Sequence, residues 1–168
     1  MHIPFDKLPD HSRIWIYQAS RPLNSEEVSI ISDELSAFTK EWTAHGIPLE
    51  ASYDIRFHQF VILGADERVQ EASGCSIDDS VRKVKELEGK IGGVDLFDRR
   101  RIAFMIGRDV ITIPMEDLKK EFNNSVWHGG TLVFNNVIKS KSELTSGWLI
   151  PAEITWLKRY LPRETIAR

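Results

Sequence analysis

The residue types that could do chemistry gather around Cys75, in the stretch SGCSIDDSVR. It is the one cysteine of the chain, so it cannot form an internal disulfide. Ser76 and Asp79, three residues apart, fit the S-x-x-[DE] capping box that begins many helices. A cysteine at a helix start lies near unpaired N–H groups and the positive end of the helix dipole, which favours the thiolate. The pattern is therefore typical either of a nucleophilic thiol or of an ordinary helix start.

A cysteine nucleophile also needs a base, and His45 and His58 are the candidate partners. In this hypothesis the thiol of Cys75 carries out acyl or thiol chemistry and one histidine accepts its proton. The alternative is a structural cysteine, because free cysteines are among the most buried residues and are then inert. Asp78 and Asp79 oppose an anionic sulfur at the same place. We favour the structural interpretation.

The same loop could bind a ligand, because backbone N–H groups from Gly74 to Ser76 would face an anion at the helix start. A lone glycine is weak support for such a site, and the two aspartates that follow neutralise the helix end. The histidines are scattered and no cysteine–histidine cluster has metal-site spacing. We expect neither a metal nor another cofactor.

A second candidate site lies on a predicted sheet face. Asp54, Arg56 and His58 share one side of a strand, and Trp15 and Tyr17 share a side of another strand. An acid, bases and aromatic walls are the mixture that small-molecule sites favour, and the same surface would suit a peptide or protein. The alternatives are a solvated face in which Arg56 bridges Asp54, which we favour, and a stacking surface for single-stranded RNA. The sequence lacks the K/R-G-F/Y-G/A-F-V-x-F/Y signature of RNA-binding sheets, so we expect no nucleic-acid partner.

The bulk composition is that of an ordinary globular protein. The 168 residues are 42% hydrophobic and 28% charged, enough for a core without disulfides or metals. A formal charge of −3 gives no overall attraction to nucleic acid or to anionic membranes. No secretory signal is visible, and no apolar run approaches the roughly 20 residues that span a bilayer. We expect a cytoplasmic protein without membrane insertion.

Hydrophobic periodicity predicts one α+β domain over residues 1–168, with a mixed or mainly antiparallel sheet, helices packed on one face and no linker. The clearest helix, from Asn24 to Gly46, has a capping box with Glu27. Residues 53–63 favour one long strand over a hairpin, because no turn residue interrupts them. The other predicted elements are a strand over 13–19, a helix over 76–91, a hairpin over 101–114 turning at Gly107, a short helix over 115–122, a last strand over 131–138 and a helix over 151–161.

Several stretches together carry a resemblance: IWIYQASRPL, WTAHG, ASGCSIDDSVRKVKELE, VDLFDR and LVFNN. They resemble a family of small uncharacterised bacterial proteins that are sometimes labelled ABC-transporter ATPases. The resemblance implies a bacterial protein and carries over no catalytic residue.

The ATPase label does not agree with the residues. An ABC ATPase needs G-x-x-x-x-G-K-[ST], whose backbone N–H groups and lysine hold the phosphates. The one Gly-Lys pair, Gly89-Lys90, is followed by Ile91, and Val84 stands where the first glycine belongs. We therefore expect no ATPase activity.

Two hypotheses remain. The favoured one is a non-catalytic binding protein whose sheet face contacts a small molecule, a peptide or a protein; the chain could also form an oligomer. The other is a small enzyme that uses Cys75. Exposure of Trp148 or Trp156 would indicate a protein interface instead of the sheet face.

Overall fold

The computed structural model describes residues 1–163, which combine helices with antiparallel strands and confirm the α+β class. The contacts of the chain gather in two compact units. Unit 1 is Met1–Asp98 with Asn136–Leu144, and unit 2 is Arg99–Asn135 with the described part of Thr145–Arg168. That the whole chain is one domain stays a prediction of the sequence. Among the described residues, no helix has the length and apolar character needed to cross a membrane.

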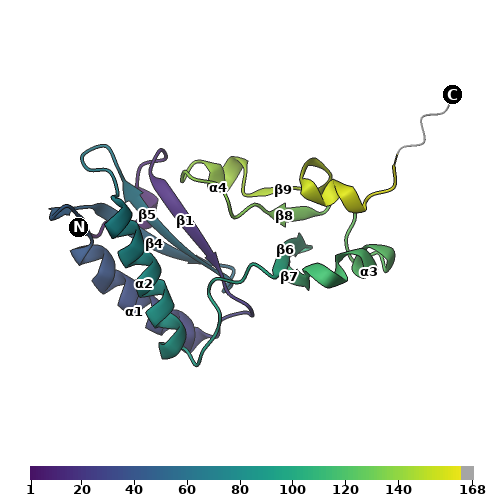
Figure 1. Ribbon diagram of the computed structural model, residues 1–168, viewed down its shortest axis with the longest axis horizontal. Helices are drawn as coiled ribbons and strands as arrows, with labels where there is room; N and C mark the ends of the chain where they lie inside the picture. Colours follow the sequence, from purple (N-terminus) through teal and green to yellow (C-terminus); the bar gives the residue numbers. More distant parts are fainter. Residues whose placement is uncertain (164–168) are drawn as a thin grey trace. The chain divides into compact units, whose positions relative to one another are not determined.

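Unit 1 is a three-stranded antiparallel sheet in the order β1-β5-β4, with two long helices (Figure 1). The central strand β5 pairs with β1 on one side and with β4 on the other. A short β2–β3 hairpin follows the first helix. The elements are η1 (Phe5–Lys7), β1 (Arg13–Gln18), α1 (Ser25–Glu41), β2 (Thr43–Ala44), β3 (Ile47–Pro48), β4 (Glu50–Arg56), β5 (Phe60–Asp66) and α2 (Gly74–Lys90).

Helix α1 begins as the sequence predicts. The side chain of Asn24 accepts a hydrogen bond from the backbone N–H of Glu27, and the Glu27 carboxylate accepts one from the backbone N–H of Asn24. The helix ends at Glu41, before the predicted end at Gly46. The reason is that His45 and Gly46, both with positive φ, make the β2–β3 turn instead of a helix end.

The segment predicted as one long strand is a hairpin, and that prediction is wrong. β4 turns into β5 at Phe57 and His58, which have φ values of 55° and 50°. Positive φ at both central positions is the type I′ pattern that usually takes glycine or asparagine, so the sequence gives no turn signal here. Contacts hold the turn from outside: the His58 carbonyl accepts from the Leu23 N–H, and the Gln59 carbonyl accepts from the Ala19 N–H.

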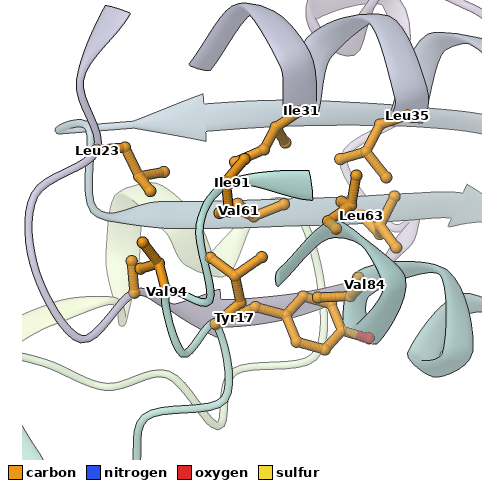
Figure 2. Packing of buried hydrophobic residues seen from close by; sticks show 12 residues of the cluster. Tyr17, Leu23, Ile31, Leu35, Val61, Leu63, Val84, Ile91 and Val94 are labelled. Atoms are coloured by element: carbon orange, nitrogen blue, oxygen red, sulfur yellow. The ribbon is translucent and has the colours of Figure 1, made fainter. Parts of the chain in front are cut away.

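The core of unit 1 lies between this sheet and the two helices (Figure 2). Side chains at alternate positions of β5 face the helices, because successive residues of a strand point to opposite faces. The apolar stripe predicted for α1 supplies the other side of this layer. The buried residues shown are Tyr17, Leu23, Ile31, Leu35, Val61, Leu63, Val84, Ile91 and Val94.

The N-cap of helix α2 lies three residues before the predicted one. Its N-cap is Ser73, whose side chain accepts from the Ser76 N–H, so Ser76 is not the cap. Ser76 lies buried in the first turn, and its hydroxyl donates to the Ser73 carbonyl. The capping box predicted from Ser76 and Asp79 is therefore wrong, because Ser73 caps the helix through a single hydrogen bond.

Two lysines of α2 form ion pairs with helix α1. Lys83 and Lys90 both bind the Glu34 carboxylate of α1, and Lys90 Nζ lies 2.5 Å from Glu34 Oε1. These pairs lower the pKa of Glu34 and connect the two helices.

Unit 2 is a four-stranded antiparallel sheet in the order β7-β6-β8-β9. The hairpin predicted at Gly107 is confirmed, since Ile106 pairs with Asp109 across a two-residue turn in which Gly107 has φ 64°. The predicted C-terminal helix is wrong, because β9 and two short 3₁₀ helices occupy that segment. The elements are β6 (Arg101–Ile106), β7 (Asp109–Pro114), η2 (Met115–Asp117), α3 (Leu118–Asn123), β8 (Leu132–Phe134), β9 (Leu149–Pro151), η3 (Ala152–Ile154) and η4 (Trp156–Tyr160), and the short helix α4 (Glu143–Ser146) begins in unit 1 and ends in unit 2.

Trp127 is the centre of the unit 2 core. It is fully buried, stacks on Phe104 with 5.3 Å between ring centroids, and contacts Phe122 edge-on. Its indole N–H donates to the carbonyl of Leu118 at 2.9 Å. A buried indole whose N–H has a partner is favourable, so Trp127 fixes α3 against the sheet.

The surroundings of Gly64 in β5 and Gly89 in α2 predict opposite outcomes for their substitution by alanine. A Cβ at Gly64 would lie 2.6 Å from Leu8 Cδ2, and Leu8 is itself buried. We expect Gly64→Ala to lower the free energy of unfolding by about 1–3 kcal/mol through overpacking. A Cβ at Gly89, in α2, meets nothing within 4 Å, so Gly89→Ala is expected to raise the free energy of unfolding by about 0.5–1 kcal/mol. Urea unfolding measures both, and a neutral Gly64→Ala would contradict the packing described.

Candidate functional site

The predicted sheet-face pocket does not form. Trp15 and Tyr17 pair in register with Leu63 and Val61, which face the helices. Asp54 and Arg56 pair with Ile62 and Phe60, whose positions alternate with those two and lie on the opposite face. The aromatic walls and the charged groups are therefore separated by the sheet itself.

Trp15 and Tyr17 have structural roles. Tyr17 is buried, contacts Phe97 edge-on at 5.2 Å, and burial raises the pKa of its hydroxyl. Trp15 is half-buried and contacts Trp42 at 5.7 Å, while the guanidinium of Arg13 lies 4.9 Å from its ring. Both rings therefore help to fix the sheet against the helices.

The charged pair behaves as the solvated alternative predicts. Arg56 Nε donates to Asp54 Oδ2 at 2.7 Å, and both side chains are about one-third exposed. The Arg56 guanidinium lies 5.7 Å from the ring of Phe5. His58 is exposed in the β4–β5 turn, where its Nδ1 lies 3.1 Å from the Leu23 carbonyl oxygen. These contacts stabilise the turn and the start of α1.

Cys75 is exposed, which overturns the prediction of a buried structural cysteine. It is the second residue of α2. The predicted ligand loop beside it is only partly available, because the Ser76 N–H already binds Ser73 and the Ser76 carbonyl accepts from the Trp42 indole at 2.9 Å. Gly74, the first helical residue, is exposed.

The structure does not bring His58 to Cys75. His58 contacts Leu23, next to the start of α1, whereas the start of α2 contacts Trp42, at the end of α1. Helix α1 has 17 residues and spans about 25 Å, so its two ends are too far apart for proton transfer. His45 is exposed at the β2–β3 turn, and no hydrogen bond joins it to Cys75 among residues 1–163.

A buried carboxylate lies at the end of β5, and the sequence analysis did not single it out. The Asp66 side chain is 3% exposed and accepts hydrogen bonds from Arg68, at distances down to 2.6 Å. Nε2 of His11 lies 3.2 Å from Asp66 Oδ1. The Arg68 hydrogen bonds, with the Arg68 backbone N–H and His11, lower the pKa of Asp66 to about 2. The contacts of His11 and Arg68 with Asp66 hold the chain before β1 and the loop after β5 against the end of the sheet.

An exposed aromatic surface lies at η3 and η4 of unit 2. Ile154 is 67% exposed and Trp156 is 46% exposed. The guanidinium of Arg159 lies 5.9 Å from the Trp156 ring and 5.6 Å from the Tyr160 ring, and the two rings are 6.2 Å apart. We call these four residues the Trp156 surface.

The helix predicted over residues 151–161 gave no indication of this surface, because the 3.6-residue spacing of Ile154, Leu157 and Leu161 would place all three on one face. The structure instead has Thr155 capping η4, with its hydroxyl accepting from the Leu157 N–H, and Leu157 enters the core. Trp148 is buried against Phe134 at 5.0 Å. Of the two tryptophans that would indicate a protein interface, Trp156 is therefore the exposed one.

No family model, no curated protein and no solved structure matches this chain. Within the described residues, no group of three or more His, Cys, Asp and Glu side chains could hold a metal ion.

The Asp66 cluster predicts a pH dependence of stability. The folded pKa of about 2 lies below the usual value of 3.8, so the ionised carboxylate stabilises the fold above about pH 4. This contribution, about 2 kcal/mol, is expected to disappear as the pH falls from about 4 to about 2. In urea unfolding, Asp66→Asn should be less stable than the wild type near neutral pH, and the difference should shrink over that range. The exposed Asp33→Asn is the control; a difference that stays constant with pH would contradict the role of Asp66.

Proposed function

We propose that this protein is a non-catalytic binding protein that contacts a protein partner through the Trp156 surface. The observation that carries the proposal is the exposure of Trp156 beside the still more exposed Ile154. Tryptophan, tyrosine and arginine are the residues most enriched where interfaces gain their binding energy, and all three lie together here. Leaving such apolar side chains in water is unfavourable, so their burial by a partner is a source of affinity.

The scaffold beneath the surface supports this proposal because it holds the exposed side chains in place. Leu157 and Ala152 are buried in the unit 2 core, on either side of Trp156 along the chain. The Glu153 N–H donates to the carbonyl of Gly129 at 2.9 Å, and Lys119 Nζ lies 3.3 Å from the Tyr160 carbonyl oxygen. A surface that is already ordered loses little conformational entropy on binding.

The charged residues around the Trp156 surface indicate which kind of partner would bind there. Three cations lie at the surface: Lys158 and Arg159 are exposed beside Trp156, and Lys119 lies across from Tyr160, while Glu153 is exposed beside Ile154. An apolar pocket with an acidic rim would complement this arrangement. We therefore expect a protein partner with such a pocket, and the alternative of a small-molecule ligand has no comparable support.

The test is a direct titration of a partner captured from the source cells, identified and purified. Trp156→Ala should weaken its binding by about 2 kcal/mol, roughly thirtyfold, as truncation of a central aromatic usually does. Val69→Ala is the matched control, since Val69 is an exposed apolar residue in unit 1, and it should bind as the wild type does. If no protein binds the wild type more tightly than Trp156→Ala, the proposal is wrong.

A small enzyme that uses Cys75 is the second candidate, and the exposure of this thiol at the start of α2 is the observation that favours it. The separation from His58 weighs against it, so His45 is the remaining base.

Alkylation of Cys75 by iodoacetamide separates the two candidates. Because the thiol is exposed, we expect the native protein to react at a rate close to that of the denatured protein. A native rate far above the denatured rate at neutral pH would favour the enzyme. Cys75→Ser should leave partner binding unchanged if the protein is a binding protein, and a loss of binding would contradict this assignment.

A further inference from the structure

The strand β7 forms an open edge of the unit 2 sheet. In the order β7-β6-β8-β9 it pairs with β6 on one side, and no other strand of the sheet lies beyond it. The turn at Gly107 fixes which backbone groups face outward. The N–H and C=O groups of Asp109, Ile111 and Ile113 point to β6, so those of Val110 and Thr112 point away from it.

These outward groups have no hydrogen-bond partner among the described residues. Ile111, between them, is 38% exposed, although its register partner Phe104 is fully buried. Unpaired backbone groups beside an exposed β-branched residue are a template for another strand.

The outer edges of β1 and β4 are each partly covered by backbone hydrogen bonds. At β1, the Ile14 N–H donates to the Lys139 carbonyl, and the Gln18 carbonyl accepts from the Asp98 N–H. At β4, Ala51 exchanges backbone hydrogen bonds with Met1 and Ile3.

The outer strand β9 ends at Pro151, which has no N–H to donate. The Asn135 N–H donates to the carbonyl of Trp148, the residue before β9, so the backbone groups of Ile150 also face β8 and Pro151 stands at an outward position. A proline at such a position is a common device against edge pairing. β7 also ends at an outward proline, Pro114, but Val110 and Thr112 come before it and keep their outward N–H groups.

We infer that two copies of this chain pair through β7, antiparallel and around a two-fold axis at Ile111, to form one continuous eight-stranded sheet. A second copy fits this edge because the edge is self-complementary. Val110 of each copy lies opposite Thr112 of the other, so the outward N–H and C=O groups of both residues form four hydrogen bonds. The two Ile111 side chains become direct cross-strand neighbours, which buries the exposed apolar residue of the strand.

The charges allow the same register. It places Asp109 of one copy opposite Ile113 of the other, so no like charges lie opposite one another within the paired strands. The interface is small, so we expect a weak dimer with a Kd of about 100 µM.

Sedimentation equilibrium of the full chain, at concentrations up to about 1 mM, tests this inference. Thr112→Pro removes the outward N–H of Thr112 without removing a group that pairs with β6, so it takes two hydrogen bonds from the dimer. We expect it to raise the dimer Kd about thirtyfold. Thr112→Val, which keeps the N–H and the side-chain shape, is the matched control and should dimerise as the wild type does.

Hydrogen exchange of the wild type gives a readout that does not depend on any variant folding. The amides of Val110 and Thr112 should become protected as the protein concentration rises, while the exposed turn at Gly107 should not. A wild type that stays monomeric to about 1 mM overturns the inference. So does a dimer that Thr112→Pro leaves intact, or one that Trp156→Ala disrupts instead.

Discussion

The double-sided burial of β5 is the constraint on which unit 1 depends. All seven residues from Phe60 to Asp66 are buried, so each neighbour must present a complementary face in a fixed register. A shift of one residue would move every side chain to the other face. Val61 and Leu63 consequently face the helices, while Gly64 on the opposite face leaves room for Leu8.

The same register decides which candidate groups can meet. Trp15 and Tyr17 belong to the helix-facing layer, and Asp54 and Arg56 belong to the other layer. His58 and Cys75 are kept apart by the length of helix α1. The His58 turn lies beside the start of this helix, and Cys75 lies near its end. A site that needs the aromatic and charged side chains, or His58 and Cys75, in contact cannot form in this packing. The proposed function therefore rests on a surface of unit 2.

Local signals predicted much of this fold. The capping box at Asn24, the apolar stripe of α1 and the Gly107 turn are each set by residues within a few positions of one another, so the sequence alone indicates them. The hairpin at Phe57 and His58 could not be predicted, because contacts from Ala19 and Leu23 hold residues there that do not favour positive φ. The pairing of strands, which separates Trp15 from Arg56, is likewise set by distant parts of the chain.

The Trp156 surface could not be predicted from the sequence for a similar reason. The spacing of Ile154, Leu157 and Leu161 is helical, yet β8 takes Leu149–Pro151 as a partner strand and leaves too few residues for a full helix. Short 3₁₀ turns then bury Leu157 while Ile154 and Trp156 face outward. The competition between a strand pairing and a local helix pattern therefore creates the surface that we assign to binding.

The most direct test of this assignment is the response of the tryptophan indole N–H signals in an NMR titration with the captured partner. The chain has five tryptophans, and among them Trp15 reports on the helix-facing layer of unit 1 while Trp156 reports on the proposed surface. The account predicts that the Trp156 signal shifts or broadens as partner is added and that the Trp15 signal stays unchanged. A shift of Trp15 with an unchanged Trp156 would contradict it and return the binding site to the first unit.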